Sequence, residues 1–322
     1  MKVSGFTFVR NATKLFYPVK QSIQSILPIV DEFIVALGNC DEDDATESEI
    51  LSIRSEKIKI IRSEWDLKKY PNGMEYARQT DIAKQACTGD WLFYIQSDEV
   101  VHEKYLPVIK EQCRKLLDNK RVEGLLFNYR HFWGDFNHYV VSHAWYPREI
   151  RIIRNLKDIH SWRDAQSFRH IFNFDGIDYC RKKNTRTLNV IPIDAGIFHY
   201  GFVRPPRLMQ KKAVNHRSNY DGNTLKVKNQ SEKFNYGDLS KLNVYNDTHP
   251  EVMKEWISKF DWEEDLFPTV KTKSLHPQKH EKFKYKALTF LEQKLMGGRQ
   301  LFGFKNYRVL PSLSDKDDGV GI

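Results

Sequence analysis

The chain has 322 residues, of which 40% are hydrophobic and 13% aromatic, and this composition excludes an intrinsically disordered protein. Its 16 glycines and 12 prolines are ordinary usage, and no segment recurs at a fixed period, which excludes collagen and repeat architectures. No apolar run approaches the ~20 residues that a membrane-spanning helix needs. The first residues also lack the apolar core of a signal peptide. We therefore expect a cytoplasmic protein.

The net charge of +9 is unevenly distributed along the chain. Residues 1–100 carry 12 Lys and Arg against 16 Asp and Glu, whereas residues 101–322 carry 39 against 26. The acidic front part argues against a general nucleic-acid-binding protein, and the basic remainder fits an anionic ligand or an anionic membrane surface. The four cysteines are widely spaced with no CxxC pair, which predicts buried thiols rather than a zinc ribbon or a disulfide framework.

The first hundred residues alternate between strand and helix patterns. The expected elements, in chain order, are a strand at 2–9, a helix at 18–30, a strand at 32–37, a helix near 47–54, a strand at 57–62, a helix at 74–87 and a strand at 91–95. Short, wholly apolar segments such as 32–37 are typical of strands that are buried on both faces. This alternation predicts an α/β fold with a mostly parallel central sheet flanked by helices.

After residue 100 the alternation is less regular. The further elements expected are a helix at 103–117, strands at 122–132, 149–154, 187–193 and 196–200, and helices at 205–219, 249–260 and 282–296. Residues 221–248 are polar and carry no clear period, which predicts a loop or linker, and residues 311–322 read as a flexible tail.

Ligands of open parallel sheets bind at the carboxyl ends of the strands, so the loops that leave the first, second and fourth strands are candidate sites. They carry Arg10-Asn11, the acidic run at 41–46 and Gln96-Ser97-Asp98-Glu99. The absence of GxGxxG and GxxxxGK[ST] sequences disfavours a Rossmann dehydrogenase and a P-loop NTPase. Asp98 directly follows an apolar strand, where an ionised carboxylate needs a partner. Two explanations remain open: the carboxylate binds a divalent cation, or Ser97 or Asp98 simply caps the helix that begins near 103.

The segment at 72–101, NGMEYARQTDIAKQACTGDWLFYIQSDEVV, resembles the signature of inverting nucleotide-sugar glycosyltransferases of the GT-A fold, glycosyltransferase family two. In that family a helix with a basic residue leads through a Gly-Asp turn into an apolar strand that ends in an Asp-x-Asp or Asp-Ala-Asp-Glu motif. FVRNATKLF and the acidic loop ending in Asp44-Ala45-Thr46 resemble the family's other nucleotide-contacting loops. The resemblance covers residues 3–105 well and 148–215 more loosely. One departure is Gln96, which stands where the family has its first motif Asp.

The resemblance implies a nucleotide pocket lined by Arg10 and Asp43, with Arg78 approaching the diphosphate. Ordinary solvated roles for Arg78 and Asp43 remain open, since four acids share that loop. The segment Gln96-Ser97-Asp98 would complete the nucleotide contacts, and the Gln96 amide can hydrogen-bond a ribose hydroxyl.

The resemblance further implies that Asp98 and His199 hold Mn2+ or Mg2+, because imidazole, carboxylate and diphosphate oxygens together suit Mn2+. Asp164 lies where the family places the base that takes the acceptor proton, and His160 and Asp175 are the competing choices. Several further polar residues would position the acceptor or neutralise the departing diphosphate: Gln166 and Arg169 for the acceptor, and Arg204, Arg207, Lys211 and Lys212 for the diphosphate.

We therefore expect a metal-dependent, inverting glycosyltransferase of glycan biosynthesis that moves a sugar from a UDP- or GDP-sugar to a hydroxyl of a glycan or lipid-linked acceptor. The expected divisions are a catalytic domain at 1–220, with a nucleotide-sugar half at 1–105 and an acceptor half at 106–220, a linker at 221–248, a helical C-terminal extension at 249–310 and the tail.

Two other functions remain open. A sugar-phosphate nucleotidyltransferase shares the sheet pattern but normally opens with a Gly-rich basic loop, which FVRNATK lacks. A catalytically silent glycan- or nucleotide-binding protein is consistent with Gln96. The basic segment at 271–299 also predicts a weak, peripheral contact with anionic membrane, unless its helix simply packs on the catalytic domain.

Overall fold

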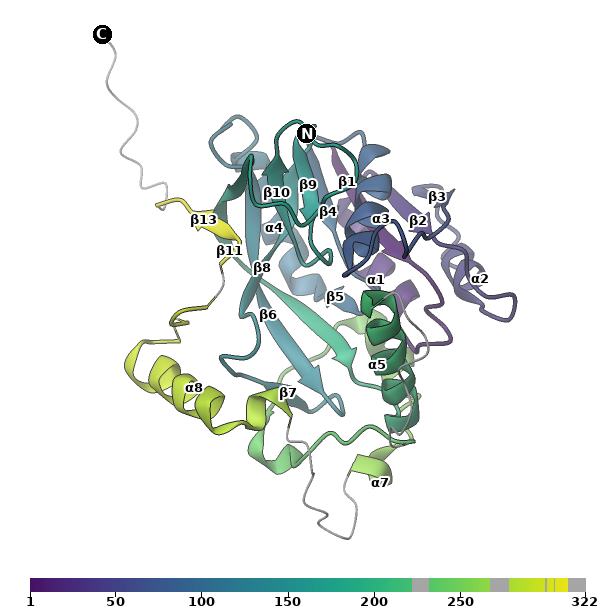
Figure 1. Ribbon diagram of the computed structural model, residues 1–322, viewed down its shortest axis with the longest axis vertical. Coiled ribbons are helices and arrows are strands. Elements are labelled where there is room, and N and C mark those ends of the chain that lie inside the picture. The colour runs from purple at the N-terminus through teal and green to yellow at the C-terminus, as the bar shows by residue number, and fades with distance from the viewer. Residues whose placement is uncertain (222–231, 267–277, 299, 304, 312–322) are drawn as a thin grey trace.

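The computed structural model describes residues 1–221, 232–266, 278–298, 300–303 and 305–311. They form an α/β architecture in which one large sheet is flanked by helices (Figure 1). The main path of the sheet runs β3-β2-β1-β4-β8-β6-β11-β10-β9. The α/β class expected from the sequence is confirmed. Within the described part of the chain, no helix has the length and apolar character needed to cross a membrane.

The first half of the sheet is parallel. Its strands are β1 (Val3–Val9), β2 (Glu32–Leu37), β3 (Ile58–Arg62) and β4 (Trp91–Tyr94). Alternate residues of β2 enter two hydrophobic clusters, Phe33 and Val35 one cluster, Ile34 and Ala36 the other, which explains its unbroken apolar run. β2 pairs with one edge of β1 and β4 with the other. The strand order therefore reverses at β1, the place where open sheets form a ligand crevice.

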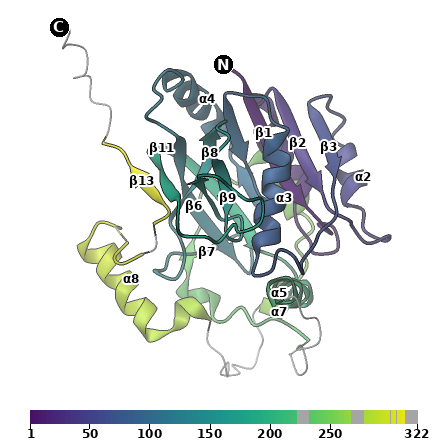
Figure 2. The same ribbon diagram turned by 45° about the horizontal axis from the view of Figure 1, so that its top comes forward.

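Helices cover both faces of this half. α1 (Val19–Ile26) and α4 (Leu106–Lys115) supply apolar side chains to one cluster. α3 (Met74–Gln85) packs over β1 and β2 on the other face (Figure 2). α2 (Thr46–Leu51) lies against α1. These helices match the sequence expectation in type and order, with ends displaced by a few residues.

The second half of the sheet is mixed. β8 (Arg148–Arg154) runs antiparallel to both β4 and β6 (Gly124–Trp133). β6 then pairs in parallel with β11 (Thr185–Phe202), a single strand where the sequence predicts two. The register between β11 and β6 shifts between Pro192 and Gly196, so a bulge, rather than a chain break, separates the two apolar runs.

Several short strands were not expected from the sequence. They are β5 (Glu99–Val101), β7 (His138–Val140), β9 (Ile159–Trp162), β10 (Ser167–Ile171), β12 (Asn243–Val244) and β13 (Tyr307–Val309). β9 and β10 form an antiparallel hairpin at the end of the main path. Their sequences, IHSW and SFRHI, carry too many polar residues for a clear strand pattern.

The C-terminal part begins with α5 (Pro206–Asp221) and continues through α6 (Lys254–Ile257), α7 (Glu263–Leu266) and α8 (Phe283–Leu295). Short 3-10 turns lie at Leu27–Ile29, Glu103–Tyr105, Leu239–Lys241, Glu251–Met253 and Lys279–Glu281. In the described part of the predicted linker, Tyr236, Leu239 and Tyr245 are buried in a third apolar cluster with Trp133, so this part is packed. Residues 222–231 and 312–322, within the predicted linker and tail, lie outside the described residues.

A buried ion pair joins β8 to β5, the short strand that pairs with the end of β11. Glu99 on β5 and Arg151 on β8 are both fully buried. Arg151 donates from Nε to Glu99 Oε2 at 2.8 Å and from Nη2 to Oε1 at 2.7 Å. Glu99 also accepts from Tyr129 Oη at 2.7 Å and from the Gln96 backbone N–H at 3.1 Å. The third guanidinium nitrogen, Nη1, donates to the Gln166 carbonyl at 2.9 Å. Arg151 therefore connects Glu99, which follows the Asp98 loop, to the turn between β9 and β10.

We expect Arg151→Met to lower the free energy of unfolding by about 3–5 kcal/mol, because Glu99 would be left buried without its cation. Urea denaturation measures this loss. The control is Arg114→Met, which breaks an exposed pair with Glu111 whose side chains are 69% and 41% exposed and should cost far less, because water solvates both charges. Equal losses in the two variants would contradict this account of the buried pair.

Candidate active site

A cleft of about 1090 Å³ lies where several segments of the chain meet. Its walls come from the loops after β1 and β4, the β9–β10 turn, the end of β11 and one side of α5. Ligand pockets are commonly about 300–1000 Å³, so the cleft can hold a ligand of nucleotide size. It sits at the reversal of strand order, as the sequence predicts.

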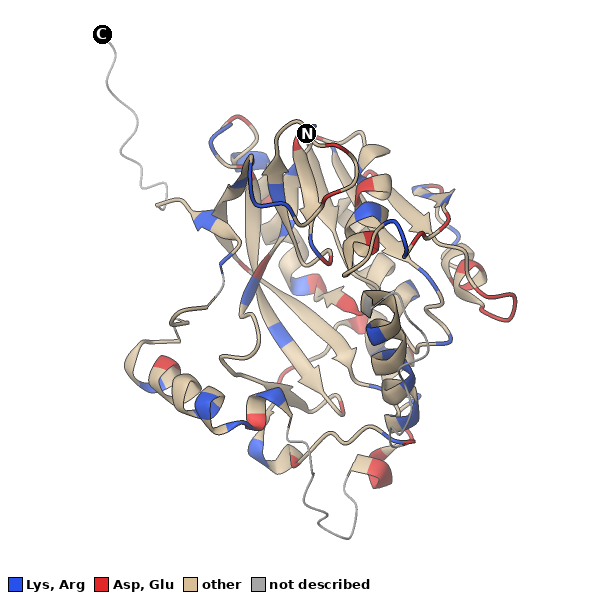
Figure 3. Cartoon of the chain, in the orientation of Figure 1, with Lys and Arg blue, Asp and Glu red and all other residues tan. Residues whose placement is uncertain are grey.

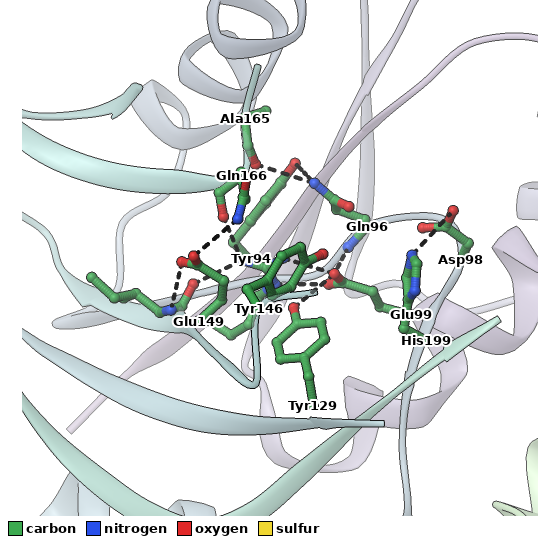
Figure 4. A network of polar contacts seen from close by, with 12 residues as sticks. Tyr94, Gln96, Asp98, Glu99, Tyr129, Tyr146, Glu149, Ala165, Gln166 and His199 are labelled. Atoms are coloured by element: carbon green, nitrogen blue, oxygen red, sulfur yellow. Dashed lines mark hydrogen bonds and ion pairs between the residues drawn. The ribbon is translucent and has the colours of Figure 1, made fainter. Parts of the chain in front are cut away.

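The centre of the cleft is Asp98, which is only 7% exposed. Its Oδ2 lies 3.1 Å from Lys212 Nζ and 3.8 Å from His199 Nε2, and Figure 4 shows the imidazole directed at the carboxylate. Burial alone would raise the pKa of Asp98, but the neighbouring charges, led by Lys212, outweigh burial and hold the pKa well below its usual range. Asp98 is therefore ionised at neutral pH.

Lys212 is the cation nearest to this carboxylate. It comes from α5, and its ammonium also donates to the Gly201 carbonyl at 2.8 Å. Burial lowers the pKa of Lys212 to about 8; repulsion from Arg204 adds to this lowering and Asp98 opposes it. Arg204 is fully buried and lies over the Tyr17 ring at 4.5 Å. Two cations thus flank one carboxylate, which leaves positive charge for an anionic ligand.

Gly201 allows this close approach. A Cβ atom at position 201 would lie 2.5 Å from His199 Nε2 and 2.7 Å from Asp98 Oδ2. Both separations are below van der Waals contact, so any side chain at 201 would push the carboxylate and the imidazole apart. Glycine is required here for space.

A chain of hydrogen bonds fixes the tautomer of His199. His131 Nε2 lies 2.8 Å from the Tyr146 carbonyl, which can only accept, so this nitrogen carries a proton. Burial lowers the pKa of His131 to about 3 and that of His199 to about 4, so both rings are neutral. His131 Nδ1 must then accept from His199 Nδ1 at 3.0 Å. His199 therefore presents an unprotonated Nε2 to Asp98.

This donor pair fits a divalent cation. A lone pair on imidazole and an ionised carboxylate face each other across 3.8 Å, an arrangement that is repulsive unless a cation lies between them, and both are ordinary ligands of Mn2+. Within the described residues no cluster of three His, Cys, Asp or Glu ligands occurs. A bound cation would therefore take its other ligands from water or from a ligand molecule.

The β9–β10 turn brings Asp164 and Gln166 to the cleft. Arg163 and Ala165 on either side of Asp164 have positive φ angles of 59° and 61°, so the turn is strained. Hydrogen bonds hold it: Tyr220 Oη donates to Asp164 Oδ2 at 2.5 Å, and Gln96 Nε2 donates to the Ala165 carbonyl at 3.1 Å. The strained turn thus aims a carboxylate into the cleft.

An aromatic wall closes the cleft on the side of β1. The rings of Phe8 and Tyr76 stack with centroids 5.8 Å apart, and Trp65 packs edge-on against Tyr76 at 5.5 Å. The Arg10 guanidinium lies 5.2 Å from the Trp65 ring centroid. Such rings offer a surface on which a planar base or a sugar can stack.

The cleft contains most of the site residues that the sequence predicts. They are Arg10, Gln96, Ser97, Asp98, Asp164, Gln166, His199 and Lys212. Of the three candidate bases, only Asp164 lines this cleft, whereas His160 and Asp175 line a separate pocket beside α3.

The structure does not bring two of the predicted nucleotide contacts to the cleft. The Asp43 side chain is 77% exposed and pairs with Lys14 at 2.5 Å, and Asp41 of the same loop lines the cleft instead. Arg78 pairs with Glu75 at 2.8 Å and lines the separate pocket. Neither side chain is positioned to touch a nucleotide bound in the cleft.

Four predicted acceptor or diphosphate residues also lie elsewhere, and one of them, Arg207, lines the same surface pocket on α5 as Lys211. Arg169 is on β10, with its guanidinium over Trp162 at 4.0 Å. Lys211 lines a shallow pocket on α5, because successive helical residues point about 100° apart and only Lys212 turns toward the cleft. Arg204 does not line the cleft and acts on Asp98 from the protein interior.

Sequence reasoning missed several residues of the site. His216 and Tyr220 follow the predicted Lys212 at every fourth residue on α5 and line the cleft with it, so this helical spacing is a signal that the sequence carried. Trp65 and His131 have no such signal, since the first is in a loop and the second is one of many aromatic residues in its segment.

No protein-family model and no curated protein matches the chain. Among solved structures it is similar to glucosyl-3-phosphoglycerate synthase from Mycobacterium tuberculosis in complex with Mn2+, uridine diphosphate and phosphoglyceric acid. The identity is 19%, over 41% of this chain and 43% of that chain, with a TM-score of 0.28. It is also similar to S. aureus TarS, at 14% identity over 70% of this chain and 41% of that chain, with a TM-score of 0.36. The chain spans less than half the length of these structures, and similarities this partial do not establish a function.

A second buried carboxyl group lies behind the cleft. Glu149 is 4% exposed and accepts from Gln166 Nε2 at 3.2 Å. Burial raises the pKa of Glu149 from 4.5 to about 7, although Arg151 opposes the rise. Between these pH values the folded protein keeps a proton that the unfolded chain has lost, so Glu149 lowers the stability as the pH rises through this window.

Glu149→Gln, which stays neutral, should remove this pH dependence. The free energy of unfolding of the variant, relative to the wild type, should rise by up to about 3 kcal/mol between pH 4.5 and 7. Urea unfolding at several pH values tests this, with exposed Glu111→Gln as the control. If the difference in the free energy of unfolding between the variant and the wild type does not change with pH, the pKa of Glu149 is not raised in the folded protein.

Proposed function

We propose that the protein is a glycosyltransferase that takes a sugar from a nucleoside-diphosphate sugar bound in the cleft and transfers it to an acceptor hydroxyl with inversion. The observation that carries this proposal is the Asp98–His199 pair, which faces the cleft at the reversal of strand order with Lys212 alongside. Carboxylate, neutral imidazole and lysine together match the needs of a cation-bound diphosphate. The aromatic wall of Phe8, Trp65 and Tyr76 would hold the base.

Asp98 and His199 would hold the divalent cation, Mn2+ or Mg2+. When bound, that cation supplies positive charge that stabilises the leaving diphosphate. Lys212 adds a second cation from α5, and Arg204 adds a third from the interior. Gln96 stands where the family motif has its first Asp. Its side chain donates to the Ala165 carbonyl and so links the Asp98 loop to the turn that carries Asp164.

The transfer step assigns the proton to Asp164. The acceptor oxygen bonds to the anomeric carbon while the bond from that carbon to the diphosphate oxygen breaks, and the electron pair leaves on the diphosphate. The hydroxyl proton passes to the Asp164 carboxylate. Attack from the face opposite the diphosphate inverts the anomeric centre. Tyr220 holds Asp164 through its hydroxyl, and Gln166 beside it would contact the acceptor.

Two single-residue variants separate donor binding from transfer. Asp98→Asn should weaken Mn2+-dependent binding of UDP or GDP by at least about tenfold, roughly 1.4 kcal/mol, and abolish transfer. Asp164→Asn should retain nucleotide binding but lose transfer from the donor sugar, because no base remains. Calorimetric titration with and without Mn2+, followed by assay of nucleoside diphosphate release, measures both.

The matched controls are Asp43→Asn and Asp175→Asn, acids that lie outside the cleft. Both should behave as the wild type. Nucleotide binding without any release of nucleoside diphosphate would favour a catalytically silent binding protein. Unchanged Mn2+ dependence in Asp98→Asn would overturn the proposed cation site.

The role of His131 gives an independent test that needs no turnover. His131→Phe removes the acceptor for His199 Nδ1–H, so the imidazole loses its orientation, whereas His131→Gln keeps an acceptor oxygen. We expect the Phe variant to bind Mn2+ about 10–100-fold more weakly in the presence of UDP and the Gln variant to lose much less. Electron paramagnetic resonance of free Mn2+ reports the affinity, and melting temperatures control for folding. Equal affinities in the Phe and Gln variants would refute the tautomer argument.

A further inference from the structure

Helix α8 is attached to the rest of the protein through its polar side. His143 Nδ1 lies 2.6 Å from Glu292 Oε1, and the His143 backbone N–H donates to Thr289 Oγ1 at 2.9 Å. The Tyr285 ring stacks on the His143 ring, with centroids 6.0 Å apart. Glu292 is the buried residue of this helix, at 3% exposure. The face of α8 that meets the body is therefore polar.

The other side of α8 is apolar and faces solvent. Phe283 is 85% exposed, Phe290 is 62% exposed and Leu291 is 39% exposed, and Leu295, at the margin of this side, is 69% exposed. At 100° per residue, Phe283, Phe290 and Leu291 lie opposite Tyr285 and Thr289. Contiguous exposed apolar side chains mark a surface that meets something other than water. The side of α8 that lies away from His143 thus exposes aromatic, aliphatic and lysine side chains together.

The charge of this surface is positive. Lys282, Lys284, Lys286 and Lys294 are all exposed on or beside α8, and the acid on this helix, Glu292, is occupied by His143. Figure 3 shows these basic positions along the helix, which projects from the body at the side away from α5. Lysines among exposed aromatic and aliphatic side chains are the composition of helices that lie in a lipid interface.

We propose that α8 docks the protein on a membrane surface that carries anionic lipid. Phe283, Phe290 and Leu291 enter the boundary between head groups and acyl chains, and the lysines contact the anionic head groups. A second copy of the chain is a poorer occupant, because an isologous contact through this face would bring the lysines of both copies together. The proposal is independent of the proposed transfer reaction, since α8 contributes no residue to the cleft.

Sedimentation with sucrose-loaded vesicles tests the docking surface in the full-length protein. At low salt we expect at least about fivefold more protein to pellet with vesicles containing phosphatidylglycerol than with phosphatidylcholine alone, and less at high salt. The double variant Phe283→Glu, Phe290→Glu should lose binding to both kinds of vesicle. The triple variant Lys284→Glu, Lys286→Glu, Lys294→Glu should lose the preference for anionic lipid.

The controls are Leu51→Glu, an apolar residue of α2 that is 59% exposed, and Lys110→Glu, an exposed lysine of α4. Both should pellet as the wild type does. All the altered side chains are exposed, so melting temperatures and UDP binding should remain unchanged, which separates this proposal from the one on transfer. Wild-type protein that stays in the supernatant with anionic vesicles at low salt would overturn the proposal. So would a dimer in sedimentation velocity that the Phe variant dissociates without any vesicle binding.

Discussion

The Glu99–Arg151 pair is the interaction on which the geometry of the cleft depends. Arg151 lies on the first antiparallel strand beside the parallel part of the sheet, and Glu99 follows the loop that carries Asp98. The same guanidinium holds the Gln166 carbonyl at the turn that carries Asp164. The two carboxylates proposed for metal binding and for proton transfer are therefore positioned by one buried cation. Neither carboxylate bonds to Arg151 itself: Asp98 pairs with Lys212, and Asp164 accepts from Tyr220.

The electrostatics of the cleft follow from its mixed origin. The parallel half of the sheet supplies the carboxylate Asp98, whereas β11 and α5 supply the imidazole and the ammonium. Each group alone would be an expensive burial. Together the charges of Asp98 and Lys212 offset each other, while burial keeps His199 neutral and its bond to His131 fixes the tautomer. An anion and a divalent cation can enter such a site together with little net change in charge.

The sequence predicted the first half of the molecule well because parallel strands buried on both faces are continuous apolar runs, as in β2. Their order also located the loops of Arg10 and Asp98. The sequence could not predict the β9–β10 hairpin, because its strands are short and polar. The hydrogen bonds that hold Asp164 in the turn of that hairpin were therefore not predicted either. Arg78 and Lys211 were misplaced for a related reason. A helix brings a residue to the region of a site, but only packing decides which side of the helix faces it.

The second half of the sheet shows a different limit. Two apolar runs separated by Asp194-Ala195 read as two strands, but a bulged strand is equally compatible with them. The distinction matters because β11 is one continuous strand, and its C-terminal end places His199 at the cleft. The sequence also could not predict which side of α8 faces the rest of the protein. A pattern of apolar residues indicates that a helix has an apolar face, but it does not indicate what that face contacts.

The contact at Gly201 has a consequence for how this chain can diverge. With a Cβ atom at 201 separated by less than 3 Å from both His199 and Asp98, the three positions cannot vary independently. A related chain with any other residue at 201 cannot keep Asp98 and His199 in this arrangement. A chain that has lost this pair no longer needs glycine at 201. In any related sequence, the residue at position 201 therefore indicates whether a carboxylate and an imidazole can still approach each other as Asp98 and His199 do.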